Sequence, residues 1–294
     1  MDTGLSGTYV LYKDWYERTY GKDACKQFKM GCYSCPGECN PYAEEKNVGT
    51  FADGSTASLL VNERRMRNRR TILALLSVPP TSPQTVPRQL YISKFIKKYA
   101  VSICAPGDVV LFTGTLILGD SSGLCAIKSA VTTIPMTEPH EDSHFDSDLS
   151  SYGLVSSTGE TFAQQVQHGS AIYDTGVFSI YIPKTIFEAL LNQISFFAGA
   201  GVYVKSIRGV WFITDKGYSS FPTLTFSVGS KQRPFIIRIP PNKYAIKCDG
   251  KWCILALDHY DETDILFGRP CFTTYFSSYD YKSQTVSIAE YASR

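Results

Sequence analysis

The tripeptide Asp-Thr-Gly occurs twice in the chain, as Asp2-Thr3-Gly4 and Asp174-Thr175-Gly176, 172 positions apart (174 − 2). Two carboxylates brought within a few ångström cannot both ionise, so they share one proton and titrate as a pair. The ionised member can take a proton from a water molecule while the protonated member donates a hydrogen bond to a carbonyl. Glycine at the third position lets backbone pack closely behind the carboxylate. The repeat therefore predicts a water-activating dyad of Asp2 and Asp174.

Short apolar runs and turn residues surround the second motif. Residues 171–173 are apolar and lead into Asp174 as a strand, and residues 183–194 follow as a helix. Further strands are expected at 221–226, 235–239, 253–257 and 276–288, because aromatic and β-branched residues concentrate there. The second half is therefore expected to consist mainly of strands that hold the Asp174 loop.

The first half also favours strands. One strand is expected at 8–12, and Asp53-Gly54 is a strong hairpin signal within 48–61. Apolar and basic residues at 87–99 have helical spacing. Strands are expected at 101–104, 109–112 and 115–119, and the polar, acidic residues 133–151 are expected to form a loop.

The composition excludes several classes of protein. Hydrophobic residues make up 44% and charged residues 19% of the 294 positions, which is typical of a globular protein and not of a disordered one. The formal net charge of +2 gives no reason to expect nucleic acid as a partner. Apolar runs such as Ile180-Tyr181-Ile182 are far shorter than the roughly 18 residues needed to cross a bilayer. We therefore expect no membrane span.

Cysteine usage indicates an oxidising compartment. The chain has nine cysteines, more than a cytosolic enzyme usually carries, and disulfides are the expected use of most of them. Cys248 and Cys253 flank an Asp-Gly pair, so a hairpin can bring them together. Cys104 with Cys125 is a second candidate pair. Cys271 is then expected to remain unpaired.

Two patterns bear on metal binding. His140-Glu141-Asp142-Ser143-His144 has the spacing of a zinc motif that requires a helix, but Pro139 and the few apolar flanking residues favour a polar loop. Four cysteines lie within residues 25–39 and include a Cys-x-x-Cys spacing at Cys32 and Cys35. Disulfides are the preferred interpretation of this cluster, with zinc as the alternative. We expect no metal and no other cofactor.

The second half closely resembles the C-terminal lobe of pepsin-like aspartic proteases, over nearly all of residues 150–292. That family has an Asp-Thr-Gly loop, then a helix, then a strand like Phe221-Pro222-Thr223-Leu224-Thr225-Phe226, then an apolar-apolar-Gly turn like Leu266-Phe267-Gly268. Residues 1–125 resemble the N-terminal lobe in patches, with 51–55 similar to the flap and 116–119 similar to the closing strand. The cysteine cluster is similar to inserts of the nepenthesin-like and plasmepsin-like branches.

The resemblance implies an all-β, bilobal pepsin-like acid protease fold with a few short helices. Residues 1–128 would form an N-terminal lobe, with the cysteine-rich insert at 25–39 and the flap near 48–61, and residues 129–294 a C-terminal lobe. The implied function is that of a monomeric aspartic endopeptidase that acts on a peptide or protein substrate without a cofactor. The implied location is the secretory pathway or the extracellular space.

The resemblance also implies roles for individual residues. Asp2 and Asp174 would be the catalytic pair. Thr3 and Thr175 would bond across beneath the site, with Gly4 and Gly176 completing the two loops. Tyr9 stands where the family usually has Trp, and the substrate would be bound by Tyr9 and the flap residues Phe51, Asp53, Gly54 and Ser55.

Several departures from the family pattern concern activity. Only Met1 precedes Asp2, so the strand that enters the first loop is missing, and the nearby α-amino group is expected to favour the charged form of Asp2. Leu5 and Val177 stand where the family usually places Ser or Thr, which is expected to move the dyad toward a higher working pH. Phe51 replaces the flap tyrosine, so its phenolic hydrogen bond is lost.

The first lobe is also expected to lack part of its sheet. Only the nine residues 62–70, five of them arginine, separate the flap region from the apolar run at 72–76, and nine residues cannot supply two or three strands. Two interpretations remain open. The chain is either a fragment of an active protease or a non-catalytic, pepsin-like binding protein.

Overall fold

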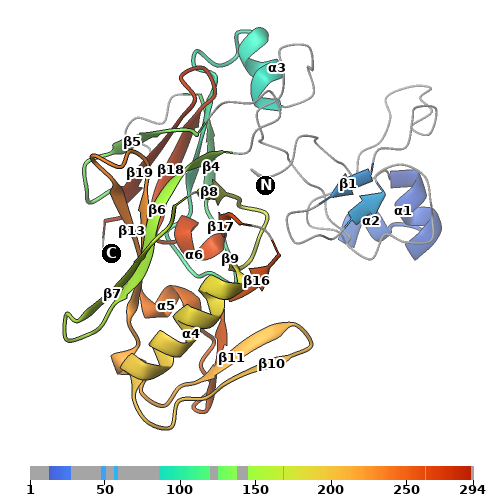
Figure 1. The fold of residues 1–294 in the computed structure, drawn as a ribbon. Helices are drawn as coiled ribbons and strands as arrows, with labels where there is room; N and C mark the ends of the chain where they lie inside the picture. Colours follow the sequence, from blue (N-terminus) through green and yellow to red (C-terminus); the bar gives the residue numbers. More distant parts are fainter. Residues whose placement is uncertain are drawn as a thin grey trace.

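The computed structural model describes residues 13–27, 48–50, 56–58, 86–119, 125–137, 145–167, 169–261 and 263–292. Strands in several sheets are the main regular structure of this part of the chain, and its helices are few and mostly short (Figure 1). The expectation of an all-β fold is therefore confirmed.

The largest sheet has eight strands and supplies many of the residues of the core. Its order along the main path is β13 (Phe235–Ile239), β12 (Thr223–Val228), β6 (Asp146–Val155), β8 (Ser170–Tyr173), β17 (Ile265–Phe267), β9 (Ile180–Pro183) and β16 (Leu257–Tyr260), with β7 (Thr161–Gln165) paired to β6. Leu224, Phe226 and Val228 alternate along β12 and are buried, as the period of two of a strand requires. One face of this strand therefore belongs to the core.

The strand β17 lies between β8 and β9, which follow each other in the sequence. It runs parallel to β8, with Phe267 opposite Tyr173, and antiparallel to β9, with Leu266 opposite Tyr181. The strands β8 and β9 therefore do not pair with each other, and the chain between them, residues 174–179, forms a loop at the end of β17.

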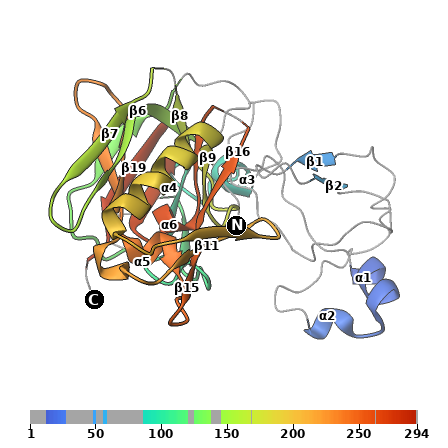
Figure 2. The same ribbon diagram turned by 60° about the horizontal axis from the view of Figure 1, so that its bottom comes forward.

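Helix α4 (Lys184–Ala198) begins directly after β9 and packs against β6, β9 and β16, and Figure 2 shows it running across this sheet. Its buried residues are Phe187, Leu190, Ile194 and Ala198, which is the spacing of one helix face. The expected helix at 183–194 is confirmed and runs four residues further. It ends at Gly199, whose φ of 91° suits glycine.

Two smaller sheets complete this part of the molecule. Five strands are ordered β4 (Thr115–Leu118), β3 (Ala100–Cys104), β18 (Tyr275–Asp280), β19 (Thr285–Glu290) and β5 (Thr132–Pro135). Four strands are ordered β10 (Val204–Ile207), β11 (Val210–Thr214), β15 (Trp252–Leu255) and β14 (Ala245–Ile246), near η1 (Tyr218–Ser220) and α5 (Pro241–Tyr244). The five-stranded sheet combines strands from both sides of residue 128, so the expected lobe boundary there stays a prediction.

Four short elements are described before residue 86. They are the helices α1 (Lys13–Tyr20) and α2 (Ala24–Gln27) and the strands β1 (Val48–Thr50) and β2 (Thr56–Ser58). The two strands pair antiparallel, with Thr50 opposite Thr56, and thus flank the Asp53-Gly54 pair that predicts a hairpin. Residues 51–55 themselves lie outside the described residues, as does the strand expected at 8–12.

Three local expectations were wrong. The helix expected at 87–99 is α3 (Val86–Ile92), because Lys94 adopts a φ of 61° and Phe95 donates its N–H to Leu90 O at 2.9 Å, which closes the helix. Residues 109–111 form a turn and not a strand, because the Asp108 carboxylate accepts the N–H of Val110 at 2.6 Å. The strands β5 and β6 occupy both ends of the loop expected at 133–151.

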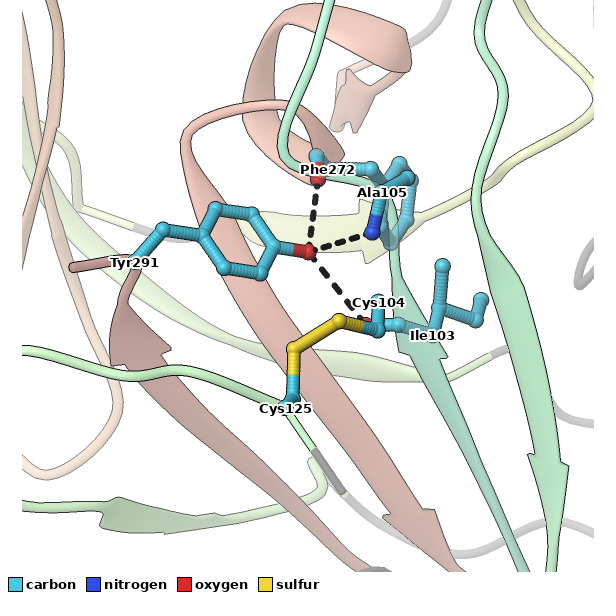
Figure 3. The surroundings of a disulfide bond; sticks show 6 residues. All are labelled: Ile103, Cys104, Ala105, Cys125, Phe272 and Tyr291. Atoms are coloured by element: carbon cyan, nitrogen blue, oxygen red, sulfur yellow. Dashed lines mark hydrogen bonds between the residues drawn. A yellow bond between two sulfur atoms is a disulfide. The ribbon is translucent and has the colours of Figure 1, made fainter. Parts of the chain in front are cut away.

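The cysteine pairs Cys104–Cys125 and Cys248–Cys253 form disulfides, as expected. Figure 3 shows that the Tyr291 hydroxyl lies beside the first of them, where it accepts the N–H of Ala105 at 2.7 Å and donates to Phe272 O at 3.2 Å. The residue that follows β19 is thereby bonded to the residue that follows β3. Cys25 is also disulfide-bonded.

We expect the two disulfides to differ in their effect on stability. Replacing Cys104 and Cys125 by alanine should lower the free energy of unfolding by about 3 kcal/mol, because this bond closes a loop with a sequence separation of 21. Replacing Cys248 and Cys253 should cost less, about 2 kcal/mol, because the separation is 5. Urea unfolding followed by tryptophan fluorescence measures both, and a larger loss for the shorter loop would contradict this prediction.

Candidate active site

The loop 174–179 holds Asp174 at the end of β8. The Asp174 N–H donates to Phe267 O at 3.0 Å, so the first residue of the loop is bonded to the last residue of β17. The Gly176 N–H donates to Asp174 Oδ1 at 2.7 Å. Asp174 and Thr175 are buried, with 3% and 2% of their surfaces exposed. Backbone groups therefore fix both the position and the orientation of this carboxylate.

Gly268 follows β17 and packs against the far side of the loop. A Cβ atom on Gly268 would lie 2.2 Å from Ser179 O and 2.7 Å from Val177 O, which is closer than van der Waals contact allows. The Arg269 N–H then donates to Val177 O at 3.2 Å. Only glycine leaves room for this approach, which gives the apolar-apolar-Gly turn a physical reason.

Buried phenols lie behind Asp174. The Tyr173 hydroxyl and Ser147 Oγ share a hydrogen bond of 2.9 Å, and burial raises the pKa of Tyr173 far above its ordinary value. Burial likewise raises the pKa of Tyr279, and the negative charge of Asp174 adds to that rise. Burial therefore favours the neutral form of both phenols, which add polar groups next to the loop.

An apolar side chain follows the motif. Val177 is buried, with 8% of its surface exposed, and its Cγ2 would lie 2.9 Å from a Cβ on Gly268. A valine offers no hydrogen-bond donor to a carboxylate. The loop therefore lacks the hydroxyl that a Ser or Thr at this position would bring.

The described residues contain no group of three His, Cys, Asp or Glu side chains arranged to hold a metal ion. Cys271 is the free cysteine among them, and burial raises the pKa of its thiol, so it carries no thiolate that could act as a nucleophile or ligand. The His140 to His144 pattern lies outside the described residues, and so do Cys32, Cys35 and Cys39.

Of the predicted site residues, the structure describes those of the second motif. Asp174, Thr175 and Gly176 lie together on the loop between β8 and β9. The others lie outside the described residues: Asp2, Thr3, Gly4, Tyr9, Phe51, Asp53, Gly54 and Ser55. Their roles, and the pairing of Asp2 with Asp174, stay predictions.

Comparison with known families agrees with this geometry. The family model of eukaryotic aspartyl proteases matches residues 86–291, which include the Asp174 loop, β17 and Gly268. The chain belongs to the eukaryotic aspartyl protease family. A comparison with curated proteins gave no match. The match confirms, at the level of the family, the resemblance found in the sequence. Aspartyl proteases hydrolyse peptide bonds.

The sequence did not predict three features around the Asp174 loop of this aspartyl protease. Ser147 supports Tyr173 from a strand that was expected to be a loop. The Phe267 carbonyl, which accepts the Asp174 N–H, is a backbone group, so the residue type gives no indication of this bond. Arg269 stands directly after Gly268 and contacts the loop, and no motif of the sequence marks it.

We expect the substitution Gly268→Ala to destabilise the protein. The new methyl group would meet two backbone oxygens that cannot move separately from the loop, so the free energy of unfolding should fall by about 2–3 kcal/mol. Gly107→Ala is the matched control, since a Cβ there meets nothing within 4 Å, and it should change stability by less than about 0.5 kcal/mol. Urea titration of both variants makes the comparison, and equal losses would refute the argument from close packing.

Proposed function

We propose that this aspartyl protease family member is an endopeptidase whose nucleophilic water is activated between Asp2 and Asp174. The observation that carries the proposal is the Asp174 loop, in which the Gly176 N–H donates to the buried carboxylate at 2.7 Å and the Asp174 N–H donates to Phe267 O at the end of β17. Such an arrangement fixes a carboxylate before substrate arrives, which is what general base catalysis requires.

The reaction follows from two carboxyl groups that share one proton. The ionised carboxylate removes a proton from water while the water oxygen attacks the scissile carbonyl carbon. The protonated carboxyl donates a hydrogen bond to the carbonyl oxygen, which becomes the oxygen of a tetrahedral intermediate. Transfer of a proton to the amide nitrogen then breaks the carbon–nitrogen bond and releases an amine and a carboxylic acid.

The remaining roles are assigned by the same proposal. Thr3 and Thr175 tie the two loops together, and the flap around Phe51 to Ser55 covers an extended peptide or protein substrate. The enzyme acts as a monomer and needs no cofactor. Its place is the secretory pathway or the extracellular space, which the two disulfides support. In the described part of the chain, no helix is both long and apolar enough to span a membrane.

A second candidate function is favoured by Val177. The buried valine leaves the Asp174 loop without the hydroxyl that a Ser or Thr would contribute, and Leu5 repeats this at the first motif. A chain with both changes could retain the peptide-binding cleft and have lost turnover. This candidate is a non-catalytic pepsin-like protein that binds peptides without cleaving them.

The substitution Asp174→Asn decides between the two functions. It keeps the size of the side chain but removes the general base, so cleavage of a denatured protein should fall by roughly a hundredfold to ten-thousandfold. Glu160→Gln, the same chemical change at an exposed residue next to β7, is the control and should retain full activity. Assays from acidic to neutral pH follow cleavage by mass spectrometry. A folded chain without activity at any pH would support the binding protein.

The substitution Val177→Thr should move the acid limb of the pH profile to lower pH, by about one unit. We expect the added hydroxyl to donate to the ionised form of the Asp174 carboxylate, which would then persist at more acidic pH. The exposed Val210 on β11 provides the matched control Val210→Thr, which should leave the profile unchanged. Rates of peptide cleavage at a series of pH values measure the shift, and a shift to higher pH would contradict the prediction.

A further inference from the structure

Arg269 connects the candidate catalytic loop to a distant segment of the chain. It follows Gly268 and is the first residue of α6 (Arg269–Phe272). Its backbone N–H donates to Val177 O at 3.2 Å, on the loop that carries Asp174. Its side chain extends to another segment, where Nη1 donates to Val110 O at 3.3 Å. One residue thus bonds two segments that come from opposite sides of β6 in the sequence.

The guanidinium group also contacts two aromatic rings. Its central carbon lies 5.3 Å from the centroid of the Phe112 ring and 5.4 Å from that of Phe178. Both distances lie within the range of cation–π attraction. Phe178 belongs to the loop that carries Asp174 and Phe112 to the distant segment, so the cation contacts a ring from each of them. Lysine could not replace arginine here. The planar guanidinium group can stack on rings and donate hydrogen bonds in its plane at the same time, whereas the lysine ammonium group cannot.

The distant segment is itself held firmly. Asp108 Oδ1 accepts the N–H groups of Val110 and Leu111 at 2.6 and 3.0 Å, which shapes residues 108–112 into a turn. Lys243 Nζ donates to Gly107 O at 2.7 Å and fixes the start of this turn. We call residues 108–112 the support turn.

Apolar packing adds to the polar contacts between the support turn and the loop. Val109 is buried in a small cluster with Ile246 and Ala256, and the cluster also includes Val110 and Phe178. The support turn thus presents a rigid surface to the part of the loop that follows Gly176. Arg269 is the polar link across this surface.

We propose that Arg269 is a positioning residue for Asp174. It holds Val177 and Phe178 against the support turn and thereby keeps the Asp174 carboxylate in a single orientation. Arg269 acts through the loop and need not touch substrate. The proposal rests on the proposed function for its effect on catalysis, but its effect on the loop is independent of activity.

Hydrogen exchange and kinetics test the proposal in the full chain. In Arg269→Met and Arg269→Lys, backbone amides in peptides covering 174–180 and 106–113 should exchange at least tenfold faster, while peptides from β12 keep the wild-type rate. In the same variants kcat should fall at least tenfold, with KM for a short peptide changed less than threefold. Arg238→Met, at an exposed arginine on β13, is the matched control and should change none of these values.

The outcomes separate this proposal from the proposed function. If exchange in the Arg269 variants is faster in the two segments alone, the positioning role is supported. If the wild type has no activity, the protease function is overturned, whatever the exchange result. Unchanged exchange, or faster exchange in β12 as well, overturns the positioning role. If the Arg269 variants do not fold, Phe112→Leu keeps the cation and removes one ring. It should raise exchange in the same two segments by about threefold, and no rise would overturn the proposal.

Discussion

The backbone hydrogen bonds on both edges of β17 are the interaction on which the rest of this structure depends. Because β17 occupies the place between β8 and β9, the loop that joins those two strands cannot close into a hairpin and must arch over the end of β17. That arch carries Asp174, and Gly268 lets the next turn pack beneath it. A three-residue strand thus determines where a carboxylate stands and which backbone groups it meets.

The surroundings of the loop combine rigid packing with neutral polarity. Tyr173 and Tyr279 place phenol groups behind Asp174, and their burial keeps them uncharged. The loop is also bonded by Arg269, whose planar guanidinium group contacts two aromatic rings. Hydrogen bonds from backbone groups stabilise the ionised form of such a buried acid, as the Gly176 N–H does for Asp174.

The features predicted from the sequence are those that depend on nearby residues. The helix at Lys184–Ala198 has a repeating apolar face, and Cys248 and Cys253 are brought together by the turn between them. The position of β17 between β8 and β9 was not predicted, because it depends on pairing with strands more than eighty residues away. Arg269 and Ser147 act through contacts across the fold, and their residue types alone carry no such information. The short α3 depended on the backbone of Lys94, which periodicity does not reveal.

The place of β17 between β8 and β9 affects the order in which these strands can pair during synthesis. The end of β8 leaves the ribosome 92 residues before the start of β17 (265 − 173), and β9 follows β8 almost at once. Through that interval the two strands lack the neighbour that belongs between them, and long-range pairings of this kind form slowly. The Asp174 loop is therefore completed only after β17 has been synthesised. A polypeptide that stops short of β17 lacks the strand that holds the Asp174 loop, so incomplete chains cannot assemble this site.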